Sequence, residues 1–379
     1  MKKQAFVFFI TILFYVSLVA QNDSIETKFS VSGDFRFRIE QDWGSRKSDG
    51  TNREDRSRLR YRARLGVNYK INRWGKIGMR IRTGYFIKQQ DPHLTIGDGL
   101  NEFGSLPIGI EKLYFEAHSG VFTGWIGKNT YPFKKHNELF WSDNVYPEGI
   151  TVGAKFKESS GIFGSWSLMS GHYILRSSGT SFDKDQYFQG VQIITSFLDN
   201  KIEVFPSFYY FNNMPDVPDG NQTYFLDYAI IHLGVSVGVL KNPSIKLGGD
   251  YYNNFNNLKK NDSVPAAFRD QKQGFSLSVD VGELKGKGDL AFNATLTRLE
   301  RYAIVDFLAQ NDWARWDYSS MGSPDGRLSN LKGMELRGDY LLQKNFRLCL
   351  RYFIVEQLIP TGIAKETGNR IRLDLDINF

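Results

Sequence analysis

The sequence contains a single cysteine, Cys349, and only 11 prolines in 379 residues. One cysteine excludes an intramolecular disulfide, so stability has to come from a closed hydrogen-bonded ladder or from a large core. After the first 20 residues no long apolar run remains, because charge or glycine interrupts each one within a few residues. The sequence therefore predicts no membrane-spanning helix, and any insertion into a membrane has to be as a closed barrel.

Signals for metals, cofactors and nucleic acids are also missing. The five histidines and the cysteine show no ligand spacing such as H-x-x-x-H or C-x-x-C, and there is no complete phosphate-binding loop. The net charge of +7 falls to +5 without Lys2 and Lys3, which is too mild to indicate a nucleic-acid partner. We expect no metal, no cofactor and no nucleic acid. Residues 253–257 and 306–325 carry oxygen ligands suited to Ca²⁺, but polar turn chemistry is the favoured explanation of both segments.

The N-terminus has the layout of a cleaved secretory signal. Lys2 and Lys3 precede an apolar run over residues 5–18, which ends at Val19-Ala20-Gln21. This run is too short to span a bilayer as a helix, and no cysteine follows it to accept a lipid. The sequence predicts a signal peptide over residues 1–20 and a single mature domain over residues 21–379.

The last eleven residues, 369–379, alternate between apolar and polar side chains up to a terminal aromatic, Phe379. Alternation with period two predicts a β-strand with one face for hydrocarbon and one for water. In a soluble sandwich the apolar face packs a core, whereas in an outer-membrane barrel it faces lipid and the polar face lines the lumen. A chain that ends on the aromatic residue of such a strand resembles bacterial outer-membrane barrels, in which the last strand signals to the insertion machinery.

Strand-like runs of about ten to fourteen residues recur about sixteen times along the mature chain. They cover residues 28–41, 57–71, 76–88, 110–119, 121–130, 150–158, 163–175, 187–198, 201–212, 224–238, 244–255, 272–284, 289–301, 331–342, 346–358 and 369–379. Short connections follow the even-numbered runs and long ones the odd-numbered runs. This asymmetry predicts an all-β fold, a transmembrane antiparallel barrel with short periplasmic turns and long extracellular loops.

Rows of arginine occupy the polar face of the early and late strands. In the second run four arginines alternate with apolar residues, and each would cost roughly 2–4 kcal/mol at the bilayer midplane, so this face has to be lumenal. If the last strand closes on the first, the rows join into one pore-lining panel. Its members are Arg36, Arg38, Arg58, Arg60, Arg62, Arg64, Arg80, Arg82, Arg347, Arg351, Arg370 and Arg372.

A panel of guanidinium groups in a pore favours anions, because each stays charged and binds carboxylate or phosphate in a fork. The alternative is a mutually paired wall with weak selectivity. In that case the arginines are neutralised in part by Asp34, Glu40, Glu335, Asp339, Asp374 and Asp376.

The long connection over residues 131–149 follows the fifth run, the position from which the third outer loop of sixteen-stranded porins folds into the lumen. It carries Glu138, Asp143 and Glu148 beside three aromatic residues. Acids opposite the arginine panel would create a transverse field at a constriction. Alternatively, the loop covers the mouth and its aromatic residues pack inward for stability.

Several motifs resemble the bacterial Putative porin family. The motifs of the third loop are Gly127-Lys128-Asn129, Pro132-Phe133, Trp141-Ser142-Asp143-Asn144 and Pro147-Glu148-Gly149. Those of the C-terminal part are residues 325–333 and Gly338-Asp339-Tyr340. Residues 58–66 and the final strand, residues 373–379, complete the resemblance. The resemblance implies a passive channel for small hydrophilic solutes in the outer membrane of a Gram-negative bacterium. Its implied partners are outer-membrane lipid, the barrel insertion machinery and anionic solutes, and it is compatible with a homotrimer. Phosphate-selective porins and alginate exporters share this layout, so a substrate-specific oligosaccharide or alginate-type channel is the alternative.

Residues 234–238 match the G-x-S-x-G pattern of a hydrolase nucleophile, which requires a strand, a sharp turn and a helix. Here the pattern lies inside an alternating strand, and His232 on the same face is four residues from Ser236, about 13 Å away. We therefore expect no enzyme. An outer-membrane lipase and a secreted sandwich that binds polysaccharide are the rival interpretations.

Overall fold

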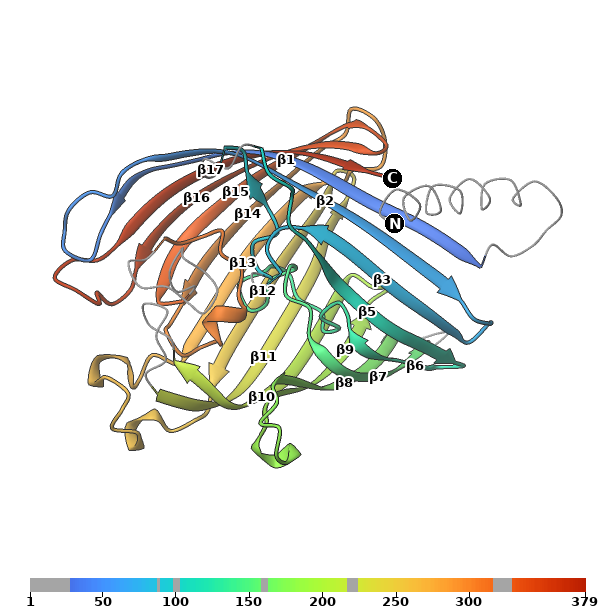
Figure 1. The fold of residues 1–379 in the computed structure, drawn as a ribbon, viewed down its shortest axis with the longest axis horizontal. Coiled ribbons are helices and arrows are strands. Elements are labelled where there is room, and N and C mark those ends of the chain that lie inside the picture. The colour runs from blue at the N-terminus through green and yellow to red at the C-terminus, as the bar shows by residue number, and fades with distance from the viewer. Residues whose placement is uncertain (1–27, 87–88, 98–102, 158–162, 217–223, 316–328) are drawn as a thin grey trace.

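The computed structural model describes residues 28–86, 89–97, 103–157, 163–216, 224–315 and 329–379. Within these ranges seventeen strands form one antiparallel sheet, and the first strand pairs with both the second and the last, so the sheet closes into a barrel (Figure 1). Among the described helical segments none has the length and apolar character needed to cross a membrane. The predicted signal peptide, residues 1–20, lies outside the described residues.

The ring consists of sixteen strands, and the structure places them close to the predicted runs. The first eight are β1 (Phe29–Arg46), β2 (Arg56–Lys70), β3 (Gly75–Thr83), β5 (Ile108–Ser119), β6 (Phe122–Lys128), β7 (Glu148–Lys157), β8 (Phe163–Arg176) and β9 (Gln186–Phe197). The others are β10 (Ile202–Asp216), β11 (Tyr224–Lys241), β12 (Ser244–Asn254), β13 (Gln273–Gly282), β14 (Leu290–Leu299), β15 (Leu331–Gln343), β16 (Phe346–Gln357) and β17 (Thr367–Asn378).

The predicted fold class is therefore confirmed, with two local differences. The third strand ends at Thr83 rather than at residue 88, because Gly84 has a φ of +106° and a Cβ there would lie 2.9 Å from the carbonyl oxygen of Pro92. A two-residue strand, β4 (Leu94–Thr95), then pairs with β2 and holds the following loop against the barrel wall.

Alternation along the strands separates an apolar outer face from a polar inner one. Leu59, Leu65 and Leu373 are 39–45% exposed on the outside, the face that meets lipid in a membrane. Arg60 and Arg372 lie on the opposite faces of the same strands and are at most 4% exposed. The arginine rows therefore point into the lumen.

The seam between β1 and β17 is a ladder of opposite charges. Arg36 faces Asp376, Arg38 faces Asp374, Glu40 faces Arg372 and Asp42 faces Arg370. A slip of one residue would turn all of these charges toward lipid, so the ladder fixes the register. Phe379 completes the seam, because its backbone N–H and carbonyl exchange hydrogen bonds of 3.0 and 2.9 Å with Gly33.

The hydrophobic core lies inside the lumen, against β8 to β12. Tyr228 and Ile230 occupy the face that is nominally polar, yet both are nearly inaccessible. The reason is that two of the three loops that fold inward, at residues 131–141 and 302–314, pack on this half of the wall (Figure 1). We call the inward loops L2 (described residues 84–86, 89–97 and 103–107), L3 (residues 129–147) and L7 (described residues 300–315 and 329–330); each connects neighbouring strands at the same end of the barrel.

Candidate functional site

Loops L2, L3 and L7 meet inside the barrel and bind one another largely through backbone groups. The N–H of Ser142 in L3 donates to the carbonyl of Leu308 in L7 at 2.8 Å, and the N–H of Gln310 donates to the carbonyl of Glu138 at 3.1 Å. The side-chain amide of Asn144 donates to the carbonyl of Gln90 in L2 at 3.2 Å. The lumen is thus narrowed by three segments, whereas the sequence predicted an inward fold for L3 alone.

One side of L3 packs on an aromatic wall, which we define as the inward side chains Tyr173, Phe188, Tyr209, Phe211 and Tyr252 of β8 to β10 and β12. Phe140 stacks on Tyr252 with ring centroids 5.3 Å apart, and Trp141 lies 5.3 Å from Phe188. The indole N–H of Trp141 donates to the carbonyl of Val145 at 2.8 Å. This half of the lumen is dry and packed at protein density, so it holds the loop in place.

Asp250 on β12 is the polar anchor of L3. Its carboxylate is hydrogen-bonded to His136 Nδ1 at 3.0 Å and to His232 Nε2 at 2.9 Å. It also accepts hydrogen bonds from Asn137 and Ser276, at 3.2 and 3.1 Å. Donors from L3, β11 and β13 therefore converge on one buried carboxylate, which compensates its burial.

The twelve predicted pore-lining arginines lie on adjacent strands at the opposite side of the lumen. They occupy β1 to β3, β16 and β17, which closure of the barrel makes continuous. We call them the arginine wall. Three further arginines, Arg56, Arg337 and Arg315 of L7, belong to the same network of ion pairs.

Carboxylates neutralise much of this wall. Arg38 binds Asp374 through two parallel hydrogen bonds of 2.6 and 2.8 Å, and Arg351 binds Glu335 at 2.6 Å. The paired carboxylates are Asp34, Glu40, Asp42, Asp91, Glu111, Asp312, Glu335, Asp339, Asp374 and Asp376. Within the described residues these acids are fewer than the arginines they contact, so the wall keeps an excess of positive charge.

On β2 and β3 one carboxylate serves several guanidinium groups. Glu111 is the common partner of Arg64, Arg80 and Arg82, at 3.1, 2.6 and 3.7 Å. Three positively charged side chains therefore converge on one buried acid at this part of the wall.

Of the predicted constriction acids, Glu138 and Asp143 lie on L3 beside cavities that wall arginines also line, and Glu148 lies at the rim. Glu138 accepts the N–H of Asp143 at 2.8 Å, Asp143 pairs with Lys135, and Glu148 begins β7 and pairs with Lys128 at the rim. Asp143 and Glu148 form ion pairs with these lysines rather than with arginines of the wall. Burial raises the pKa of Glu138, and the nearby Asp143 adds to the rise.

Two acids that sequence reasoning missed face the wall directly. Asp91 of L2 pairs with Arg60 at 2.6 Å, and Asp312 of L7 pairs with Arg351 at 2.9 Å and with Arg372. Burial acts to raise the pKa of Asp312, but Arg372 and Arg351 outweigh it and hold the pKa well below its usual range. The one signal in the sequence that could have identified Asp91 and Asp312 is that L2 and L7, like L3, are long connections that carry acidic residues.

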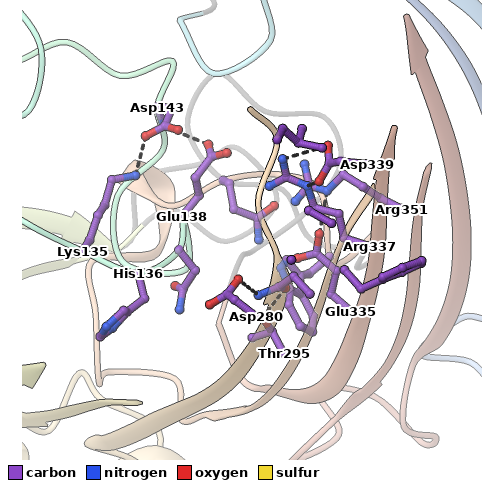
Figure 2. A pocket seen from close by; sticks show the side chains of 18 residues that line it. Lys135, His136, Glu138, Asp143, Asp280, Thr295, Glu335, Arg337, Asp339 and Arg351 are labelled. Atoms are coloured by element: carbon purple, nitrogen blue, oxygen red, sulfur yellow. Dashed lines mark hydrogen bonds and ion pairs between the residues drawn. The ribbon is translucent and has the colours of Figure 1, made fainter. Parts of the chain in front are cut away.

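Two connected cavities separate the loops from the arginine wall. One of about 420 Å³ has Lys135, Glu138 and Asp143 on one side and Arg337 and Arg351 on the other. Figure 2 shows these side chains facing each other across the gap. The second, about 300 Å³, shares several of these residues and extends to the β1 and β2 arginines. The open, polar part of the lumen therefore lies on the side of the arginine wall and not at the centre of the barrel.

The described residues contain no cluster of three or more histidine, cysteine or acidic side chains suited to a metal ion. Of the calcium alternative named above, residues 316–325 lie outside the described residues. Asp306 is buried and lies 3.4 Å from the Ser329 hydroxyl.

Comparison with solved structures gives the same architecture. OprB of Pseudomonas putida is matched with a TM-score of 0.56 at 11% identity, over 93% of this chain and 94% of that one. A Salmonella typhi OmpF complex with daunomycin is matched with a TM-score of 0.54 at 12% identity, over 93% and 97%. A triple mutant of Rhodopseudomonas blastica porin gives 0.52 at 10%, over 92% and 100%. No curated protein sequence matches the chain.

A closed sixteen-stranded barrel with loops folded into a polar lumen is the architecture of a porin-like outer-membrane channel. Residues 49–225 match the family described as Putative porin. The family resemblance inferred from the third-loop motifs is thereby confirmed, while the C-terminal motifs lie outside the matched residues.

Proposed function

We propose that the protein is a porin through which small hydrophilic solutes diffuse passively, with a preference for anions. The observation that carries the proposal is the arginine wall itself, whose guanidinium groups border the polar cavities and outnumber the described carboxylates that they contact. Side-chain charge of one sign along a narrow pore raises the local concentration of counter-ions and favours their passage. Carboxylates neutralise part of the arginine wall, so we expect the preference for anions to be modest.

In this proposal L3, L2 and L7 set the size limit, and solutes pass between these loops and the arginine wall. Arg62 and Arg64 border the second cavity. The aromatic wall does not conduct, because packed side chains fill it. We further propose assembly as a homotrimer, cleavage after residue 20, and recognition of Phe379 by the insertion machinery.

A second candidate is a channel specific for an oligosaccharide. A cavity of about 560 Å³ lies where L2, L3 and L7 meet β8 and β10, and it is lined in part by Phe86, Trp141 and Phe307. Aromatic and other apolar surface at an entrance suits solutes with an apolar ring face. The secreted sandwich considered from the sequence is excluded by the closed barrel.

The test is the reversal potential of the purified protein in a planar bilayer under a gradient of potassium chloride. A passive channel gives stepwise changes in conductance. If the channel prefers anions, the reversal potential has the same sign as the equilibrium potential of chloride under the gradient. Cation preference would overturn the arginine argument. Block of the current by a neutral oligosaccharide at submillimolar concentration would favour the second candidate.

A further inference from the structure

Ser236, His136 and Asp250 form a hydrogen-bonded chain that joins β11, L3 and β12. His136 Nε2 lies 2.7 Å from Ser236 Oγ, and His136 Nδ1 lies 3.0 Å from Asp250 Oδ1. Both distances are within the reach that a nucleophile, its base and an orienting acid require. Ser236 is the serine of the G-x-S-x-G sequence, and its partner comes from the inward loop rather than from the strand.

The imidazole of His136 is held in one orientation. Asp250 next to Nδ1 selects the tautomer with hydrogen on that atom, which leaves Nε2 free to accept the Ser236 hydroxyl proton. The ring lies over Gly248, where a Cβ would be only 3.0 Å from His136 Cδ2, and its centroid is 4.9 Å from that of Phe205. A base whose position is fixed by packing and by a second hydrogen bond is preorganised for proton transfer.

A second serine on the same carboxylate provides an internal comparison. Ser207 lies 3.3 Å from His232 Nδ1, and His232 in turn lies 2.9 Å from Asp250. Ser207 is only 6% exposed, whereas Ser236 is half-buried on the inner face of β11. His136, moreover, lines the cavity of about 420 Å³. Ser236 is thus the serine of the two that combines a short hydrogen bond to its histidine with a partly exposed side chain.

We propose that Ser236 is a nucleophile with His136 as its base and Asp250 as the positioning residue, and that this centre hydrolyses small carboxylic esters that enter the lumen. Ser236 Oγ attacks the ester carbonyl while its proton moves to His136 Nε2. The C–O bond to the alcohol then breaks, and the alcohol leaves with that proton. Water, deprotonated by His136, releases the acid and returns the proton to Ser236.

The negative oxygen formed during attack needs a donor nearby. The hydroxyl of Ser278 is the candidate donor, because its Oγ would lie 2.5 Å from a Cβ on Gly248, the residue that the His136 ring covers. A small acyl group is the class of substrate that fits, since the site opens on the lumen and lies beside the Phe205 ring.

The experiment treats the purified full-length barrel in detergent with a fluorophosphonate probe, which reacts with activated serines, and measures the labelling rate and p-nitrophenyl acetate hydrolysis. Labelling of the wild type that disappears in Ser236→Ala is the expected result. His136→Gln and Asp250→Asn should each slow labelling by about 10²–10⁴. No labelling of the folded wild type, or equal labelling of Ser236→Ala, overturns the proposal.

Ser207→Ala is the matched control and should label like the wild type, because Ser207 is hydrogen-bonded to His232 and not to His136. Heat-modifiable migration on gels verifies that each variant is folded. If His136→Gln labels as fast as the wild type while remaining folded, the histidine is only an anchor of L3 and the proposal fails.

Discussion

The two sides of the lumen are built from strands with the same alternation but with opposite chemistry. The arginine wall consists of charged side chains paired with one another next to polar cavities, whereas the aromatic wall is packed dry against L3. The difference lies in what covers each face, since a loop that packs on a strand turns its inner side chains into a core. A side chain that points into the lumen is therefore not necessarily in a polar environment. The two polar cavities lie on the arginine side.

The largest expected effect comes from breaking the aromatic wall. Trp141→Ala removes a fully buried indole that contacts Phe188 and donates to Val145. Loss of a buried aromatic side chain costs about 3–5 kcal/mol, so we expect a corresponding loss in the free energy of unfolding, measured by denaturation in detergent. Trp74→Ala, at an exposed turn, is the control and should change stability by less than about 1 kcal/mol. Equal losses of unfolding free energy in Trp141→Ala and Trp74→Ala would show that the packing of L3 on the aromatic wall does not stabilise the barrel.

A smaller effect should follow from unbalancing the charged side. Glu111→Gln leaves Arg64, Arg80 and Arg82 without their shared carboxylate. We expect a loss of about 1–3 kcal/mol in stability. One charge about 10 Å from a passing ion in water corresponds to about 0.4 kcal/mol, so the chloride-to-potassium permeability ratio should rise about twofold.

Glu116→Gln provides the comparison for that variant, because it lies on the same strand and pairs with Lys76 near the end of the barrel. It should leave the permeability ratio unchanged. A rise as large as that of Glu111→Gln would mean that selectivity is spread over the whole barrel.

The smallest effect concerns pH. Burial and the neighbouring Asp143 raise the pKa of Glu138, so the folded protein binds this proton more tightly than the unfolded chain. Its contribution to stability is then complete below the ordinary value of 4.5 and is lost as the pH rises through the folded-state pKa. Glu138→Gln mimics the protonated form, so its melting temperature should depend less on pH above 4.5 than that of the wild type. Parallel curves for the two proteins would contradict this, and Glu148→Gln should follow the wild type.

The strands and their faces followed from the sequence because alternation is a local property. The arginines of β2 and β17 could be assigned to the lumen by their cost in lipid alone. The paths of L2 and L7 could not be assigned, because no periodic pattern marks a loop that folds inward. Asp91 and Asp312 were missed for that reason, and Tyr228 and Ile230 gave an ambiguous register because the core that covers them comes from distant residues.

The Ser236 network shows the same limit. Sequence reasoning tested His232, which shares a strand with Ser236, and found it too distant. The histidine that reaches Ser236 is 100 positions away along the chain, on L3, and only the inward fold of that loop brings it into contact.

The most direct test compares the reversal potentials of two charge-neutralised variants in planar bilayers. One is Arg60→Gln/Arg62→Gln/Arg80→Gln on the arginine wall, and the other is Lys259→Gln/Lys285→Gln, two exposed lysines that line neither polar cavity. At about 0.4 kcal/mol for each charge, the first should lower the chloride-to-potassium permeability ratio several-fold, while the second leaves it nearly unchanged. A ratio that stays the same in the first variant, or falls equally in both, would contradict the claim that the arginine wall selects the solute.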